Sequence, residues 1–224
     1  MGAEIQFLEK SLLGRNTDFS NIDDVVERCV KVSIRDMMIG GRYFLTKKNF
    51  ADQLTKDTIM LLKKHKYVFS KQLIIDEANY IFKGIAPSKI KKFSFVYKKG
   101  KKKGQKHYKE ATSFGLAQKV INMSYKHFYV FDSYLKSLNI NYSKCDCPLD
   151  RNVISPTKKD GNPILVGKIK AKGYAWTRIT EDQYNDIQKQ IDNLLQTDID
   201  VKGEVGKLVF SKANGRMKYD FIAW

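Results

Sequence analysis

A long run of helically spaced apolar residues, between residues 115 and 138, is the feature that most constrains the fold. Apolar side chains recur there every three or four residues, which is the spacing of one face of an α-helix. They are Ala117, Ile121, Tyr125, Phe128, Phe131, Leu135 and Leu138. The pattern predicts one long helix, and signals for strands are weak elsewhere in the chain.

Start and stop signals predict several further helices. Capping residues, acidic first turns and closing glycines delimit helices over residues 20–41, 49–66, 70–84 and 180–196, with a short one starting at Arg151. Only residues 93–97 and 208–210 have the character of short strands, and 155–173, with its prolines and glycines, predicts a long loop or hairpin. We expect an all-α fold in which residues 1–224 form a single helical domain, with room for a small β element. The packing of the tail, residues 199–224, stays open.

Composition excludes several classes of protein. Hydrophobic residues make up 42% of the 224 residues, which is enough for a core, so a wholly disordered chain is excluded. Neither a run of 18 apolar residues nor the residue order of a signal peptide is present. The three cysteines cannot form a disulfide framework and fit a reducing cytosol. We therefore expect a cytoplasmic, nucleoid-associated protein with no membrane contact.

The net charge of +17, from 41 basic and 24 acidic residues, predicts a polyanionic partner. Nucleic acid is the first candidate and an anionic membrane surface the second. Between residues 83 and 109 there are eleven lysines and no acidic residue. We interpret 83–109 as a Lys-rich loop in which Lys101, Lys102, Lys103 and Lys106 contact phosphates. The alternatives are a solvated loop that binds nothing specific and a composition that is generally rich in lysine.

Two short motifs carry the candidate chemistry. Gly115 enters the long helix, and the unpaired N–H groups of such a turn suit a phosphate. Lys119 lies one turn further on and is a candidate Schiff-base nucleophile. Asp150 could cap a helix that starts at Arg151, and beside Lys119 it would place an anion next to the amine. The plain alternatives are that Lys119 is an ordinary surface lysine and Asp150 only a helix cap.

Other common site types are not indicated. The three histidines have no ligand spacing such as HExxH, and Cys145 and Cys147 without nearby partners predict partly buried thiols rather than a metal site. No GxGxxG, P-loop or GxSxG motif occurs, which argues against common nucleotide enzymes and α/β-hydrolases. We expect neither a metal nor another cofactor.

The motif Gly115-Leu116-Ala117-Gln118-Lys119, with Asn122 after it, resembles the helix-hairpin-helix element of base-excision DNA glycosylases. In that superfamily the corresponding lysine is the nucleophile and an aspartate follows on a helix N-terminus. The interval from Lys119 to Asp150 and the segment Pro148-Leu149-Asp150-Arg151 are similar to the archaeal 8-oxoguanine (GO) glycosylase type. Ala117 stands where the family has its second glycine, and Phe114 where a proline is common. The match covers residues 112–154.

The resemblance implies a helix-hairpin-helix DNA glycosylase-like fold and an N-glycosylase with AP-lyase activity on double-stranded DNA. Lys119 would attack the sugar of a flipped nucleotide and Asp150 would assist. The duplex contacts would include Gly115, Ala117, Gln118 and Arg151, and Tyr174 and Trp176 are candidates for the base pocket. We expect a monomer. The enzyme could act in base-excision repair or in antiviral defence, and the sequence separates neither these two roles nor the possible excised bases.

Two other functions remain open from sequence. The hairpin and the Lys-rich loop could form a non-catalytic DNA- or RNA-binding module. A toxin or nuclease is the weaker alternative, because the acidic cluster or histidine pair that it needs is not evident; Asp23 and Asp24 at a helix start are better explained by the helix dipole.

Overall fold

The computed structural model describes residues 13–14, 16–41, 50–83, 90–96, 100–154, 169–171, 174–196 and 216–217. In these ranges the protein is mostly helical, as predicted. The principal helices are α2 (Ile22–Gly41), α3 (Phe50–Lys64), α4 (Lys71–Asp76), α5 (Ser113–Val130), α6 (Asp132–Leu135), α7 (Arg151–Ile154) and α8 (Glu181–Gln196). A π-helical turn, η1 (Glu77–Phe82), continues α4, and short 3-10 turns lie at Lys136–Leu138, Tyr142–Lys144 and Trp176–Arg178.

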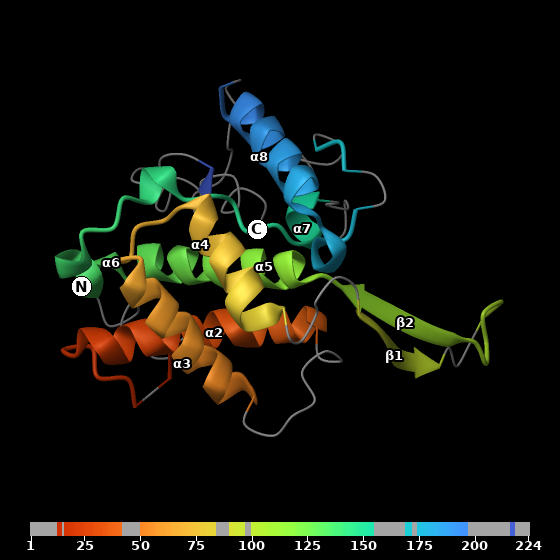
Figure 1. Ribbon diagram of the computed structural model, residues 1–224, viewed down its shortest axis with the longest axis horizontal. Coiled ribbons are helices and arrows are strands. Elements are labelled where there is room, and N and C mark those ends of the chain that lie inside the picture. Colours follow the sequence, from red (N-terminus) through yellow and green to blue (C-terminus); the bar gives the residue numbers. More distant parts are fainter. Residues whose placement is uncertain are drawn as a thin grey trace.

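Helix α5 is the centre of the fold. It packs against α2, α4, η1 and the Trp176–Arg178 turn, and it runs through the middle of the molecule in Figure 1. Its buried residues, from Gly115 through Tyr125 and again at His127 and Phe128, lie on all sides of the helix. A helix covered on every side is a core helix. Polar residues within it, including Lys119, are therefore buried together with the apolar ones.

The predicted long helix is shorter than expected. It ends at Val130, and the chain continues through α6 and a 3-10 turn to Leu138. The apolar spacing persists across this break because Phe131 and Leu135 still point into the core, where both are almost fully buried. Periodicity thus identified core residues correctly, but it indicated neither the burial of the other sides of α5 nor the break in the backbone after Val130.

Capping residues explain most of the other helix starts. The side chain of Ser70 accepts a hydrogen bond from the N–H of Leu73 at the start of α4. Thr180 and Gln183 form a reciprocal capping box before α8, with distances of 3.3 and 3.1 Å. In α2 the capping side chain belongs to Asn21, which accepts from the N–H of Asp23 at 3.0 Å, and not to Ser20 as the sequence suggested.

The interpretation of 83–109 as a loop is wrong for much of its length. Strand β1 (Ile90–Val96) pairs antiparallel with β2 (Lys106–Ala111), and the two-stranded hairpin projects from the helical body (Figure 1). Apolar and aromatic residues are interspersed with the lysines in both strands, and such residues favour strands. Gly100 and Gly104 have positive φ angles of 78° and 82° and form the turn at the tip. The expected strand at 208–210 and the expected loop or hairpin at 155–168 lie outside the described residues.

Candidate active site

The structure brings Lys119 and Asp150 together. The Nζ atom of Lys119 donates a hydrogen bond to Oδ2 of Asp150 at 2.9 Å. Lys119 is only 4% exposed and Asp150 9% exposed. The alternative that Lys119 is an ordinary surface lysine is therefore excluded. A buried ion pair of this kind needs good geometry and further hydrogen bonds to offset the loss of hydration.

Asp150 is also a helix cap, as the plain alternative predicted. Its geometry allows this role and the contact with Lys119 at the same time. Its Oδ1 atom accepts from the N–H groups of Asn152 at 2.8 Å and Val153 at 3.2 Å, at the start of α7. The other oxygen remains for Lys119. One carboxylate thus joins the first turn of α7 to the middle of α5, and its orientation is set from both sides.

Buried amide side chains hold the segment that leads to Asp150. Gln118 accepts from the N–H of Leu149 at 3.2 Å and donates to the carbonyl of Leu149 at 3.0 Å. From the opposite side, Gln188 of α8 donates to the carbonyl of Cys147 at 2.7 Å and accepts from its N–H at 3.2 Å. These paired bonds replace a strand partner for an extended backbone. Sequence reasoning missed Gln188, and a glutamine on the apolar face of α8 was the signal that could have found it.

The entry to α5 is closed by the polypeptide itself. The Oγ1 atom of Thr112 accepts from the N–H of Gly115 at 2.9 Å and donates to the carbonyl of Ile179 at 3.1 Å. The N–H of Thr112 donates to the carbonyl of Thr177 at 2.7 Å. Gly115 lies so close to this turn that a Cβ atom would stand 2.7 Å from the carbonyl oxygens of Trp176 and Thr177. The glycine is required for this close approach of backbone to backbone.

Two expectations about this region need correction. The element before α5 is strand β2, so residues 106–115 form a strand-to-helix junction where the resemblance implied a helix-hairpin-helix. Gly115, Ala117 and Gln118 are buried, so the prediction that they line a DNA-binding surface is wrong. The strand before α5 forms because β2 pairs with β1. The three residues are buried because Thr112 caps the helix and the Trp176–Arg178 turn covers its first turn.

The other predicted contact residues are placed as follows. Lys101, Lys102, Lys103 and Arg151 are exposed, the three lysines at the tip of the hairpin and Arg151 at the start of α7. Lys106 is the first residue of β2 and pairs with Val96, and its side chain is outside the described part. The expected phosphate contacts on the hairpin tip are therefore accessible.

Tyr174 and Trp176 are half-buried and pack against the hydrophobic core. Trp176 lies in the turn that covers Gly115, one helical turn before Lys119. This packing shows that both rings contribute to the core. Their assignment to a base pocket stays a prediction.

A second polar cluster lies on the α2 side of α5. The Nδ1 atom of His127 is 2.8 Å from Oγ of Ser33, and its Nε2 atom is 4.0 Å from Asp36. Burial lowers the pKa of His127 to about 3, and the charges of Lys126, Lys119 and Arg35 act in the same direction. Burial raises the pKa of Asp36, against the charges of Arg35, Lys119 and Lys126. His127 is therefore neutral at physiological pH and is a structural partner of Ser33.

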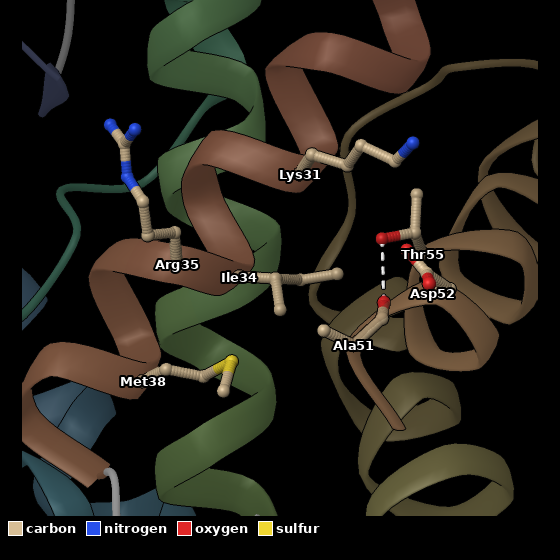
Figure 2. A pocket seen from close by; sticks show the side chains of 7 residues that line it. All are labelled: Lys31, Ile34, Arg35, Met38, Ala51, Asp52 and Thr55. Carbon is tan, nitrogen blue, oxygen red and sulfur yellow. Dashed lines mark hydrogen bonds between the residues drawn. The ribbon is translucent and has the colours of Figure 1, made fainter. Parts of the chain in front are cut away.

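A hollow of about 470 Å³ lies between α2 and α3 and is separate from the Lys119–Asp150 pair. Ile34, Met38 and Ala51 form much of its apolar wall, as Figure 2 shows. The hydroxyl of Thr55 donates within its own helix to the carbonyl of Ala51 at 2.7 Å, and Lys31 pairs with Glu27 at 2.6 Å. Thr55 and Lys31 are therefore engaged with the protein itself, while Arg35 and Asp52 also line the hollow.

Among the described residues, neither a metal site nor a membrane-spanning helix is found. No cluster of three or more His, Cys, Asp or Glu side chains in these ranges is arranged to hold a metal ion. Within the same ranges, no helix has both the length and the apolar character needed to cross a bilayer.

Comparison of the chain with protein-family models, with curated proteins and with solved structures found no match. Function is therefore inferred from the residues and their geometry.

Proposed function

We propose that this protein is a DNA N-glycosylase with AP-lyase activity, in which Lys119 is the nucleophile and Asp150 its partner. The observation that carries the proposal is the buried contact between Nζ of Lys119 and a carboxylate that comes from 31 residues away, at 2.9 Å. The resemblance of residues 112–154 to helix-hairpin-helix glycosylases supports the same pair of residues. The strand before α5 departs from that superfamily's fold.

The chemistry needs one proton transfer before bond formation. Asp150 accepts a proton from the ammonium group of Lys119, and the neutral amine attacks C1′ of the nucleotide. The bond from Nζ to C1′ forms while the bond from C1′ to the base breaks, and the electron pair leaves with the base, which then takes up a proton. Opening of the sugar ring gives a Schiff base, from which β-elimination cleaves the strand.

The partner is double-stranded DNA with one nucleotide flipped out of the stack. The exposed lysines of the hairpin tip supply phosphate contacts, and Arg151 lies next to Asp150 in sequence on the exposed start of α7. Because Lys119 and Asp150 are both more than nine-tenths buried, DNA binding has to uncover a path to Nζ. This requirement is part of the proposal.

The test is covalent trapping. Duplexes carrying 8-oxoguanine, uracil or a hypermodified cytosine are incubated with the protein in EDTA and sodium borohydride, which reduces a Schiff base to a stable adduct. We expect an adduct on at least one duplex with the wild type and with Lys126→Gln, and none with Lys119→Gln. Lys126 is the matched control because it lies two turns further along α5.

A non-catalytic nucleic-acid-binding module is the second candidate. The closed state of the Lys119–Asp150 pair favours it, together with the exposed lysines of the hairpin. Tight, salt-sensitive binding of duplexes without any adduct would support this function and reject the glycosylase.

A further inference from the structure

The segment from Cys145 to Asp150 is buried throughout, although it contains two carboxylates. Asp150 at its end meets Lys119. Asp146, four residues earlier, is 6% exposed and needs partners of its own. Both partners of Asp146 come from outside the region that resembles glycosylases.

The first partner is Arg216, near the C-terminal end of the chain. Its Nη1 atom binds Oδ1 of Asp146. Its Nε and Nη2 atoms bind the two oxygens of Asp192 on α8, each at 2.7 Å. One guanidinium therefore joins the buried segment to α8, and Met217 beside it is almost fully buried. The planar fork of arginine suits this double engagement, and a lysine could not reproduce it.

The second partner is Tyr184 of α8. Its hydroxyl donates to Oδ2 of Asp146 at 2.7 Å and accepts from Nδ2 of Asn122 at 2.8 Å. Burial and the neighbouring Asp146 raise the pKa of Tyr184 well above its ordinary value. The hydroxyl thus stays protonated and remains a donor to Asp146.

These bonds form a continuous chain, Arg216–Asp146–Tyr184–Asn122, which we call the C-terminal clasp. It starts at the C-terminal segment and ends on α5, three residues after Lys119. Gln188 also binds the same buried segment at Cys147. The clasp therefore fixes the segment that carries Asp150 relative to the helix that carries Lys119.

We propose that Arg216 and Tyr184 are positioning residues, which hold residues 145–150 so that Asp150 meets Lys119; the catalytic part of this inference rests on the proposed function. Neither residue touches Lys119 or Asp150. Their effect passes through Asp146 and Asn122. Arg216 is thus an integral part of the site, although it lies far from Lys119 and Asp150 in the sequence.

The three buried cysteines can serve as probes in a structural test of the clasp. Cys145 and Cys147 are buried within the held segment, and Cys29 is buried in α2. Tyr184→Phe removes only the bridging hydroxyl and keeps the ring that packs on Phe114. Arg216→Gln removes the guanidinium. The rate of thiol labelling, measured for each cysteine by mass spectrometry, reports local opening without any need for activity.

We expect labelling of Cys145 and Cys147 to rise at least about tenfold in both variants, while labelling of Cys29 is unchanged. Each variant loses at least the hydrogen bond to the buried Asp146, and the loss of one buried hydrogen bond corresponds to about this factor. The matched control is Glu181→Gln. Glu181 lies on α8, as Tyr184 does, and forms an exposed ion pair with Lys71 of α4. Labelling of the three cysteines in this variant should equal that in the wild type. Unchanged labelling of Cys145 and Cys147 would overturn the clasp. A parallel rise at Cys29 would also overturn it, because it would indicate general destabilisation.

The catalytic part is measured by borohydride trapping on the duplex that reacts with the wild type. We expect the trapping rate at saturating DNA to fall about tenfold in both variants, with little change in the DNA concentration that gives half the maximal rate. An unchanged saturating rate, with raised labelling, would overturn the positioning role. If the wild type forms no adduct, the proposed function fails, whereas the labelling experiment still decides whether the clasp exists.

Discussion

At the scale of single residues, Lys119 and Asp150 depend on each other unequally. Asp150 retains two backbone N–H donors from α7 when the lysine is removed. Lys119 would lose the carboxylate that its Nζ atom binds in a buried site. An uncompensated buried charge is costly, so the two single substitutions should differ in effect.

We predict that Asp150→Asn costs about 3 kcal/mol of unfolding free energy, since it strands a buried ammonium group but leaves an asparagine to cap α7. Lys119→Met should cost less, and the double variant should be more stable than the sum of the two single losses by at least about 1 kcal/mol. Urea unfolding of all four proteins gives the values. Strict additivity would show that the ion pair contributes nothing in solution.

Glu77 differs from Asp150 because it is a buried acid for which the described residues supply no cationic partner. It is fully buried in η1, and Oε1 accepts from the hydroxyl of Thr58 at 2.8 Å. Among the described residues, no group hydrogen-bonds to its Oε2 atom. Burial raises the pKa of Glu77 to about 8, and the Thr58 hydrogen bond opposes this shift.

A raised pKa makes stability fall with pH. Below about pH 4.5 the carboxyl is protonated in both states; between there and about pH 8 the unfolded state releases a proton that the folded state retains. We therefore predict that Glu77→Gln gains stability relative to the wild type as the pH rises through this window, by about 3 kcal/mol at pH 7. Unfolding at pH 5, 6, 7 and 8 measures the difference, in which the opposite titration of His127 cancels. A pH-independent difference would refute the prediction.

At the scale of elements, local signals in the sequence identified the helices and their caps better than they identified which elements pack against one another. The caps Ser70, Thr180 and Asp150 could be predicted because a cap binds backbone groups only two or three positions away. The spacing of apolar residues between 115 and 138 also predicted core residues correctly, such as Ile121 and Phe128. The end of α5 at Val130 was missed because the apolar spacing continues through Phe131 and Leu135.

The pairing of the Lys-rich hairpin and the closed start of α5 could not be predicted in the same way, although the strand expected at residues 93–97 overlaps β1. Pairing of β1 with β2 depends on contacts across the turn, and the glycines that form this turn also suit a loop. The cover over Gly115 comes from residues 176–177, about 60 positions later in the chain. In the site, Lys119 and Asp150 were predicted together, whereas Tyr184, Gln188 and Arg216 act through distant contacts that no local pattern reports.

Gly115 tests the closed junction at the start of α5. Alanine usually favours a helix over glycine, by about 1 kcal/mol. Here its Cβ would lie 2.7 Å from two backbone carbonyl oxygens, and overpacking of this kind costs about 1–3 kcal/mol. We predict that Gly115→Ala is destabilising by about 2 kcal/mol in thermal or urea unfolding. Ser113→Ala, in the same turn, should be nearly neutral, and a stabilising Gly115→Ala would show that the turn at 176–178 does not cover the helix.

At the scale of the whole molecule, charge and shape together predict how the protein would hold DNA, its proposed partner. The net charge is +17, and the lysine tip stands on a hairpin that projects from the helices (Figure 1). The candidate active site is buried in the body, at α5 and α7. A projecting basic arm can therefore bind phosphates beside the reacting nucleotide without taking part in the chemistry.

The arm and the net charge can be separated by variants of equal charge. The first variant carries Gln at Lys101, Lys102 and Lys103, and the control carries Gln at Lys56, Lys63 and Lys64, which are exposed on α3. Each phosphate contact contributes about 0.9 to the slope of log affinity against log salt. We predict that the arm variant lowers this slope by about 2 to 3 and weakens duplex binding at least about tenfold at moderate salt, whereas the control changes the slope by less than about 1. Fluorescence anisotropy across a salt series measures both.

The rate of adduct formation at saturating DNA should remain unchanged in the arm variant, since the tip lies outside the buried pair. Equal effects of the two variants would show that overall charge, and not the hairpin, attracts the duplex.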